Sequence, residues 1–343
     1  MVAVSRSGLS LAPVEPSDEA AIRQWYELRC AMVGADRPAD PPPCWIHQLG
    51  SFRYPRPGEV ETVWLARDGG SVVGGCVLAR PVLDNLHNAL GDILVAPQHR
   101  RRGIGRALLD HLRSEATRQG RRRLIGSAGQ PLDPAVPSPG GRLAAASGAV
   151  LVLVETRRRL DVGSVDPAVL PELDAQVRVK SQGYWLVQWV DGTPQQWLKD
   201  IANLKGRMST DAPLDDLQWE AEAYDAARMR ALEARSLACG RHVVTTAAVD
   251  RTGQLVASTQ IVGDVTSHWF ADQRDTIVAP EHRGHRLGTL IKVANLDHAR
   301  AQRPELRVID TCNADSNPCM IKINEAMGFR PYHRVGEWQL DLS

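Results

Sequence analysis

The chain has 343 residues, of which 43% are hydrophobic and 24% are charged. This composition is that of ordinary globular domains and excludes a disordered, fibrous or collagen-like chain. At roughly 100–200 residues per domain, the length predicts about two domains. The 41 Lys and Arg residues nearly balance the 40 Asp and Glu residues, which excludes a global field that would attract nucleic acid or an anionic membrane.

Cysteine spacing and hydropathy indicate the cellular setting. The six cysteines include no closely spaced pair, so neither a metal site nor a disulfide framework is predicted. No apolar run approaches the ~20 residues that cross a bilayer, and the amino terminus lacks the apolar core of a secretion signal. We therefore expect a cytoplasmic protein that binds no metal and no membrane.

The first half is predicted to form a strand, a tight glycine-containing turn and a second strand at residues 63–79. A third strand and a turn follow in the sequence DILVAPQHRRRGIG at residues 92–105. Apolar residues at helical spacing then predict a helix at 104–119. A loop rich in proline and glycine at 131–141 and a linker-like segment at 162–171 follow.

The second half repeats this order 183 residues later. A hairpin is predicted at 245–261, the sequence DTIVAPEHRGHRLG occupies residues 275–288, and a helix is predicted at 287–302. Asp, Val-Ala-Pro, His-Arg and the last Gly stand in register with residues 92–105. A further helix, opened by acidic residues, is predicted at 211–232.

This internal repeat predicts two copies of one α/β unit. We assign residues 1–162 to the first domain, residues 163–180 to a linker and residues 181–343 to the second domain. Each domain is large enough to bury its own core.

Each repeated segment leads from an apolar strand through a turn with glycine and arginine into a helix. Backbone N–H groups at a helix amino terminus are unpaired, and glycine lets an anion approach the main chain. Arginine adds charge-assisted donors that suit a phosphate. We therefore expect these turns to bind a pyrophosphate. The predicted residues are Arg100, Arg101, Arg102, Gly103 and Gly105 in the first copy, and His282, Arg283, Gly284, His285, Arg286, Leu287 and Gly288 in the second.

The first turn resembles the GCN5-related N-acetyltransferase family, whose signature Q/R-x-x-G-x-G/A holds the pyrophosphate of acetyl-coenzyme A. Arg100, Gly103 and Gly105 match this signature. The second turn keeps the arginine and the last glycine, but Arg286 stands where the first glycine is expected. That departure predicts a different local turn geometry unless Gly284 relieves it.

The carboxyl end of the second copy adds to this resemblance. The sequence NADSNPCMIKINEAMGF at residues 313–329 is similar to the closing N-x-x-N…N-E-x-x-G-F motif of the family. The first copy has no comparable motif at residues 142–149. The resemblance therefore implies that the second domain is catalytic, and that the first binds coenzyme A without turnover or is a structural partner.

The resemblance implies an α/β fold with a mixed α+β sheet in two tandem domains, as in two-domain members of the family from actinobacteria. It implies acetyl-coenzyme A or another acyl-CoA as the co-substrate, bound through the turn residues. Further cofactor-binding candidates are Asn313 and Asn317 of the closing motif and the strand residues Ile277, Val278 and Ala279.

An amine with a pKa near ~10 is protonated at pH 7, so its attack on a thioester needs a base, an oxyanion donor and an acid. The resemblance places the base on the strand before the turn, where Asp272 and Asp275 are candidates. We prefer Asp272, because Asp275 recurs as Asp92 in the copy that we expect to be inactive. The oxyanion donor is predicted to be a main-chain N–H within residues 277–279.

The acid is less well defined by the sequence. The family often has tyrosine immediately before the glutamate of its closing motif, and here that position is Asn324. An amide can hydrogen-bond a thiolate but cannot protonate it. Cys312, Cys319, Tyr332 and water are the alternative acids.

The leading interpretation is an enzyme of secondary metabolism or detoxification that moves an acetyl or another short acyl group from coenzyme A to a small-molecule amine. A second interpretation takes the acyl group from an acyl carrier or an aminoacyl-tRNA, which the basic run Arg121–Arg123 would suit. No other nucleic acid is expected as a partner. A third interpretation is a non-catalytic acyl-CoA-binding protein. Both a monomer and a homodimer remain open.

Overall fold

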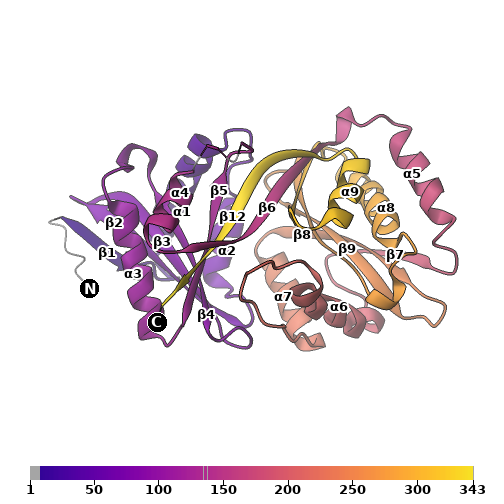
Figure 1. Cartoon of the computed structure of the whole chain (residues 1–343), viewed down its shortest axis with the longest axis horizontal. Coiled ribbons are helices and arrows are strands. Elements are labelled where there is room, and N and C mark those ends of the chain that lie inside the picture. Colours follow the sequence, from indigo (N-terminus) through magenta and orange to yellow (C-terminus); the bar gives the residue numbers. More distant parts are fainter. Residues whose placement is uncertain (1–7, 134, 137, 343) are drawn as a thin grey trace. The chain divides into compact units, whose positions relative to one another are not determined.

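The structure, a computed structural model, describes residues 8–133, 135–136 and 138–342 (Figure 1). Pro134 and Pro137 of the predicted loop lie outside the described residues. Among the helices in these ranges, none is both long enough and apolar enough to cross a membrane.

The contacts within the chain divide it into two units. The first unit consists of Met1–Leu153 and Val335–Ser343, and the second consists of Val154–Arg334. The division falls inside two long strands, β6 (Val150–Asp161) and β12 (Arg330–Asp341). The chain therefore returns to the first unit at its carboxyl end.

These boundaries differ from the predicted ones. Residues 163–180, predicted to be a linker, contain helix α5 (Val169–Arg178), which buries Leu170 and Val177 in clusters shared with helix α8 (Leu287–Gln302). The linker assignment is therefore corrected to a packed part of the second unit. The proline and glycine at the start of this segment hid the apolar spacing of the helix that follows.

The sheet of the first unit has the strand order β1-β2-β3-β4-β5-β12. The β4–β5 pair is parallel, whereas the β1–β2, β2–β3 and β3–β4 pairs are antiparallel. The bounds are β1 (Leu9–Pro13), β2 (Glu59–Asp68), β3 (Ser71–Pro81), β4 (Asn88–Val95) and β5 (Arg123–Gln130).

Alternate residues of β2 enter different cores, because successive side chains of a strand point to opposite faces of a sheet. Trp64 packs with helix α3 (Ile104–Arg118), whereas Val63 and Leu65 pack with helix α1 (Glu19–Asp36). Helices α3 and α1 therefore cover opposite faces of this sheet. The other helices of this unit are α2 (Trp45–Arg53) and α4 (Pro139–Ala146).

The sheet of the second unit has the strand order β6-β11-β10-β9-β8-β7, with a parallel β10–β11 pair and antiparallel pairs elsewhere. Helix α8 packs on one face beside Val244, and helices α6 and α7 pack on the other face beside Ala247 and Val249. The bounds are β7 (Trp185–Val190), β8 (Arg241–Val249), β9 (Leu255–Asp264), β10 (Phe270–Val278), β11 (Val308–Ala314), α6 (Leu198–Asp211), α7 (Ala226–Ala238) and α9 (Pro318–Ala326).

The predicted hairpins, the strands that precede the two turns and the helices that follow them are confirmed. The predicted helix at 211–232 is wrong, because α6 ends at Asp211 and α7 begins only at Ala226. Ala212 is extended, as expected of a residue that precedes a proline. Asp225 then caps α7 by accepting a hydrogen bond of 2.7 Å from the N–H of Arg228.

A lysine lies in the core of the second unit. Lys292 of α8 is fully buried, and its Nζ has no hydrogen-bond partner among the described residues. The nitrogen lies 5.5 Å from the centroid of the Phe329 ring. Because burial penalises the ammonium form, it lowers the pKa of Lys292 to about 7.

The stability of the second unit is therefore expected to rise with pH above neutrality. Between pH 7 and the ordinary lysine pKa of 10.5, the unfolded chain binds the proton that the folded chain has lost. The free energy of unfolding should rise by up to about 1.4 kcal/mol per pH unit in this window. In Lys292→Met, a substitution of similar length, urea unfolding from pH 7 to 9.5 should show a flatter slope. Equal slopes in the two proteins would contradict a neutral buried lysine.

Candidate functional site

Strands β10 and β11 part from one another after a short parallel ladder. In the described chain they pair only from Phe270 opposite Val308 to Asp272 opposite Asp310, although β10 continues to Val278. The first unit repeats this arrangement, because among its described residues β4 and β5 pair only over the first three residues of each strand. Each gap exposes main-chain groups to which an extended ligand can bind as a further strand.

The direction of the N–H groups along this gap follows from the pairing of β10 with β9. The N–H of Ala279 donates to the carbonyl of Val256 at 2.9 Å. Because antiparallel partners bond at alternate residues, the N–H of Ile277 also points toward β9, and the N–H of Val278 points into the gap. Of the three residues predicted to supply an oxyanion donor, only Val278 presents its N–H there.

The turns after β4 and β10 have the same backbone conformation. In the second unit a 3-10 turn leads to Gly284 (φ 88°) and Arg286 (φ 59°), immediately before α8. In the first unit the corresponding left-handed residues before α3 are Arg101 (φ 63°) and Gly103 (φ 79°). Each turn thus uses one arginine and one glycine, in exchanged order. The sequence predicted a different turn geometry because of Arg286, and this difference is not observed.

Arg286→Gly is expected to stabilise the second unit. An L-residue in the left-handed region costs about 1–2 kcal/mol, part of which the greater unfolded-state freedom of glycine offsets. We expect the free energy of unfolding to rise by about 1 kcal/mol, measured by calorimetry as a higher Tm. The opposite exchange, Gly103→Arg, should lower the Tm. A lower Tm in Arg286→Gly would mean that the arginine side chain stabilises the turn more than its backbone strains it.

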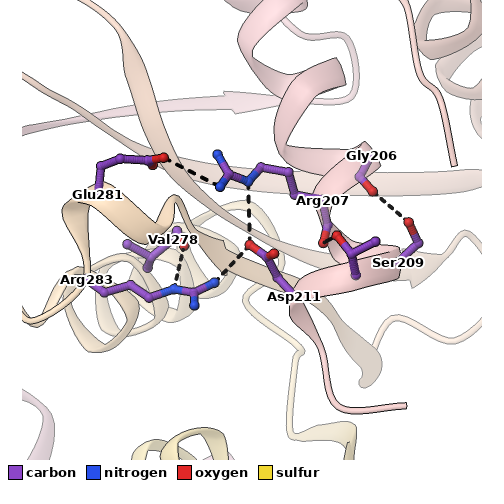
Figure 2. A network of polar contacts seen from close by, with 8 residues as sticks. Gly206, Arg207, Ser209, Asp211, Val278, Glu281 and Arg283 are labelled. Atoms are coloured by element: carbon purple, nitrogen blue, oxygen red, sulfur yellow. Dashed lines mark hydrogen bonds and ion pairs between the residues drawn. The ribbon is translucent and has the colours of Figure 1, made fainter. Parts of the chain in front are cut away.

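The signature arginine of each turn braces that turn against the end of a helix. Arg283 donates from Nη2 to Asp211 Oδ2 (2.9 Å) and from Nε to the Val278 carbonyl (3.3 Å). Figure 2 shows how Arg207 lies between Glu281 and Asp211, so that the end of α6 is tied to the turn.

The first unit has the same brace, in which Arg100 contacts both carboxylate oxygens of Asp36, at 2.7 and 2.8 Å, and donates to the Val95 carbonyl. Asp36 and Asp211 are each the last residue of their helix. In this structure the guanidinium groups of Arg100 and Arg283 pair with carboxylates, and their role in binding a phosphate stays a prediction.

The other turn residues divide into exposed and packed ones. Leu287 is almost completely buried and anchors the start of α8 in the core. A side chain at Gly288 would lie 3.3 Å from Cδ1 of Ile323, and one at Gly105 would lie 3.2 Å from Cδ2 of Leu143, so these glycines allow the close packing of two helices. The exposed residues, which a ligand can reach, are Arg101, Arg102, Gly103, Gly284, His285 and Arg286.

The two acidic candidates have different surroundings. Asp275 forms an ion pair with Nζ of Lys205, which reaches it from α6. Asp272 occupies the last paired position of β10, where the gap begins, and about a third of its side chain is exposed. Its carboxylate lies 3.5 Å from the guanidinium of Arg274. Asp272 therefore stands where the gap begins, whereas Asp275 lies on the unpaired part of β10 and is held by Lys205.

The closing motif brings two of its asparagines together. Asn324 is fully buried and donates from Nδ2 to Oδ1 of Asn313, on the strand that borders the gap. Within the described residues, Oδ1 of Asn324 has no hydrogen-bond partner. Asn317 instead caps α9 by accepting from the N–H of Met320 at 3.1 Å. In the first unit Ser138 caps α4 in the same way, so a closing helix is present without the motif.

The alternative acids lie in other environments. Cys312 and Cys319 are both exposed, and Sγ of Cys312 lies 3.7 Å from a carboxylate oxygen of Glu155. The Tyr332 ring stacks under the guanidinium of Arg159, with 3.8 Å between the ring centroid and Cζ. Cys312 belongs to β11, the strand that borders the gap, whereas Cys319 belongs to α9 and Tyr332 to β12.

A cavity of about 540 Å³ lies between α6 and the turn. Its lining includes Asp200 and Arg207 of α6, Val256 of β9, and Glu281 and His282 before α8. Because Val256 belongs to β9, the cavity lies on the β9 side of β10, whereas the gap lies on the β11 side. The cavity and the gap are therefore separate features.

Residues 59–135 match the family described as acetyltransferase (GNAT) domain. Among curated proteins, none matches the sequence. Among solved structures, a tandem GNAT protein from the clavulanic acid biosynthesis pathway, without AcCoA, is 32% identical. The match covers 98% of this chain and 99% of that chain, with a TM-score of 0.82.

Two more distant structures share the fold. A GCN5-related N-acetyltransferase from Sphaerobacter thermophilus is 11% identical over 98% of this chain and 96% of its own, with a TM-score of 0.63. A GCN5-related glucosamine N-acetyltransferase region of a fungal multi-domain GH3 beta-N-acetylglucosaminidase is 14% identical over 99% of this chain and 39% of its own, with a TM-score of 0.67. Because the tandem protein matches at higher identity over nearly the whole of both chains, this chain belongs to the GCN5-related N-acetyltransferase (GNAT) family of acyltransferases, as a tandem member.

Proposed function

We propose that this protein transfers an acetyl group from acetyl-coenzyme A to the amine of a small molecule, and that the second unit performs the transfer. The observation that carries this proposal is the gap between β10 and β11, together with the turn that follows β10. A pantetheine chain can add to a strand edge, and a pyrophosphate can bind N–H groups at a helix start. The neighbour from the clavulanic acid pathway supports a small-molecule acceptor.

Each residue has a defined task in this proposal. The main-chain N–H groups of Gly284, His285 and Arg286 bind the pyrophosphate, and the N–H of Val278 binds the thioester oxygen as negative charge develops on it. The carboxylate of Asp272 removes a proton from the amine, directly or through a water molecule. The co-substrate supplies the activated acyl group on its sulfur.

Asn324 has a limited role in this proposal. Because Asn324 is fully buried, its amide acts on the site through its neighbour Asn313, and the leaving thiolate takes its proton from solvent. Asn313 fixes the orientation of that amide by accepting from its Nδ2. Asn317 acts on the site only through the position of α9.

The first unit is proposed to bind acyl-CoA without turnover. It has the same turn and the same gap as the second unit. Asp272 is the last β10 residue paired with β11, and the last β4 residue paired with β5 is Leu90, so the proposed base is absent there. A native mass spectrum with coenzyme A would count the occupied sites.

The proposed activity is tested by thiol release from acetyl-coenzyme A with a panel of small primary amines. We expect thiol release in equal amount to the acylated amine identified by mass spectrometry. Turnover only with an acyl carrier or an aminoacyl-tRNA as donor would favour the second interpretation. Tight binding of coenzyme A without turnover on any amine would favour a non-catalytic binding protein.

A further inference from the structure

Two side chains from the segment between α5 and β7 contact the turn of the second unit. The hydroxyl of Ser181, a buried residue, lies 2.8 Å from the carbonyl oxygen of His285. The hydroxyl of Tyr184 lies 2.9 Å from Nδ1 of His282, and its ring centroid lies 5.3 Å from that of His285. Ser181 and Tyr184 therefore contact the turn at both ends.

The Ser181 hydroxyl has one hydrogen and two carbonyl oxygens within reach. The second is the oxygen of Val177 at 3.0 Å, which already accepts from the main-chain N–H of Ser181 at 3.1 Å. The His285 oxygen is the nearer of the two. The hydrogen bond of the hydroxyl is therefore assigned to His285.

This hydrogen bond fixes the direction of a neighbouring donor. In a trans peptide the carbonyl of one residue and the N–H of the next point in opposite directions. The hydrogen bond from Ser181 to the His285 carbonyl therefore fixes the orientation of the whole peptide group. The N–H of Arg286 in that peptide points away from Ser181. That N–H is one of the groups proposed to bind the pyrophosphate.

The turn of the second unit contains a strained residue that a contact from Ser181 can stabilise. Arg286 adopts a left-handed conformation that L-residues disfavour, whereas the corresponding residue of the first unit is Gly103. A strained residue persists only where its surroundings determine its conformation. Ser181 supplies a contact of that kind at the peptide immediately before Arg286.

We infer that Ser181, supported by Tyr184, is a positioning residue that holds the Arg286 peptide in its anion-binding orientation and replaces the missing glycine of the signature. This inference rests on the proposed function, because the anion is the pyrophosphate of acyl-CoA. Ser181 does not touch that ligand. Its effect is transmitted through the His285 carbonyl alone.

The test is a double-mutant cycle in the full chain with Ser181→Ala and Arg286→Gly. Ser181→Ala should weaken coenzyme A binding about five- to tenfold, the range of one lost hydrogen bond, and raise the KM for acetyl-coenzyme A with kcat unchanged. In the Arg286→Gly background the same substitution should weaken coenzyme A binding less than about twofold, because glycine adopts the left-handed conformation without a stabilising contact. Dependence on Arg286 assigns the affected site to the second unit.

Ser164→Ala is the matched control, because the Ser164 hydroxyl also donates to a carbonyl, that of Asp161 at 2.9 Å, within the second unit. Its coenzyme A affinity should equal that of the wild type. Hydrogen exchange of a peptide spanning residues 283–290 gives a readout without ligand, and exchange should be faster in Ser181→Ala than in either the wild type or the control.

Equal losses of affinity from Ser181→Ala in both backgrounds, or no loss in either, would overturn the inference while leaving the proposed function intact. A wild type that does not bind coenzyme A would instead contradict the proposed function. In that case unchanged hydrogen exchange in Ser181→Ala would also overturn the positioning role, and faster exchange would support it.

Discussion

Gly284→Val is expected to lower kcat/KM for acetyl-coenzyme A by about 100-fold, the effect of misplacing a binding group by roughly 1 Å. Gly284 has φ of 88°, and a side chain there would meet no atom within 4 Å. The cost therefore arises from the backbone, because a β-branched residue cannot adopt this conformation without strain. Kinetics at varied acetyl-coenzyme A measures the loss.

Gly103→Val is the matched control, because it places the same residue at a left-handed position (φ 79°) in the turn of the first unit. We expect it to lower stability and to leave turnover largely intact. Circular dichroism of both variants checks that they remain folded. If Gly103→Val abolishes turnover in a folded protein while Gly284→Val does not, the first unit is the catalytic one.

Asp272→Asn is expected to lower kcat by about 10²–10⁴-fold at neutral pH, the usual contribution of a general base. The substitution keeps size and polarity and removes only basicity. The loss should shrink at high pH, because an amine with a pKa near ~10 becomes deprotonated in solution there. The pH dependence of kcat/KM for the wild type and the variant measures both effects.

Asp275→Asn provides the comparison for this prediction. Asp275 lies in an ion pair with Lys205, so we expect its substitution to reduce activity at all pH values alike, without recovery at high pH. Wild-type pH profiles in both variants would show that no carboxylate of this strand is the base. The enzyme would then use amines already deprotonated in solution or an ordered water molecule.

The parts of the site that could be predicted from the sequence are local. The end of the strand, the turn and the start of the helix fall within residues 92–105 and again within 275–288, so their order, their repetition and their glycines are visible in the sequence. Asp211 and Ser181 lie 72 and 104 residues from their partners in the turn. No spacing pattern connects such distant residues, and their contacts depend on how α6 and the segment after α5 pack.

The exchange of arginine and glycine between the turns shows the same limit. The sequence indicated that Arg286 departs from the signature. A motif records which residue adopts the required backbone conformation at the lowest energetic cost. Packing decides which conformation the position adopts, and here it imposes one conformation on both residue types. The boundaries of the units were predicted wrongly for a related reason. Which sheet a terminal strand joins depends on residues far from it in the sequence.

The return of β12 to the first unit bears on the order in which the protein can fold during synthesis. Leu340 packs in the core that α3 covers, and Glu337 accepts a hydrogen bond from Ser127 of β5 at 2.7 Å. These contacts form only once residues 337–340 have been translated. The second unit is one continuous segment, Val154–Arg334, so all of its residues are translated before those of β12 that complete the first unit. Folding on the ribosome therefore departs from the usual amino-terminal-first order, because the half made first is the last to be completed.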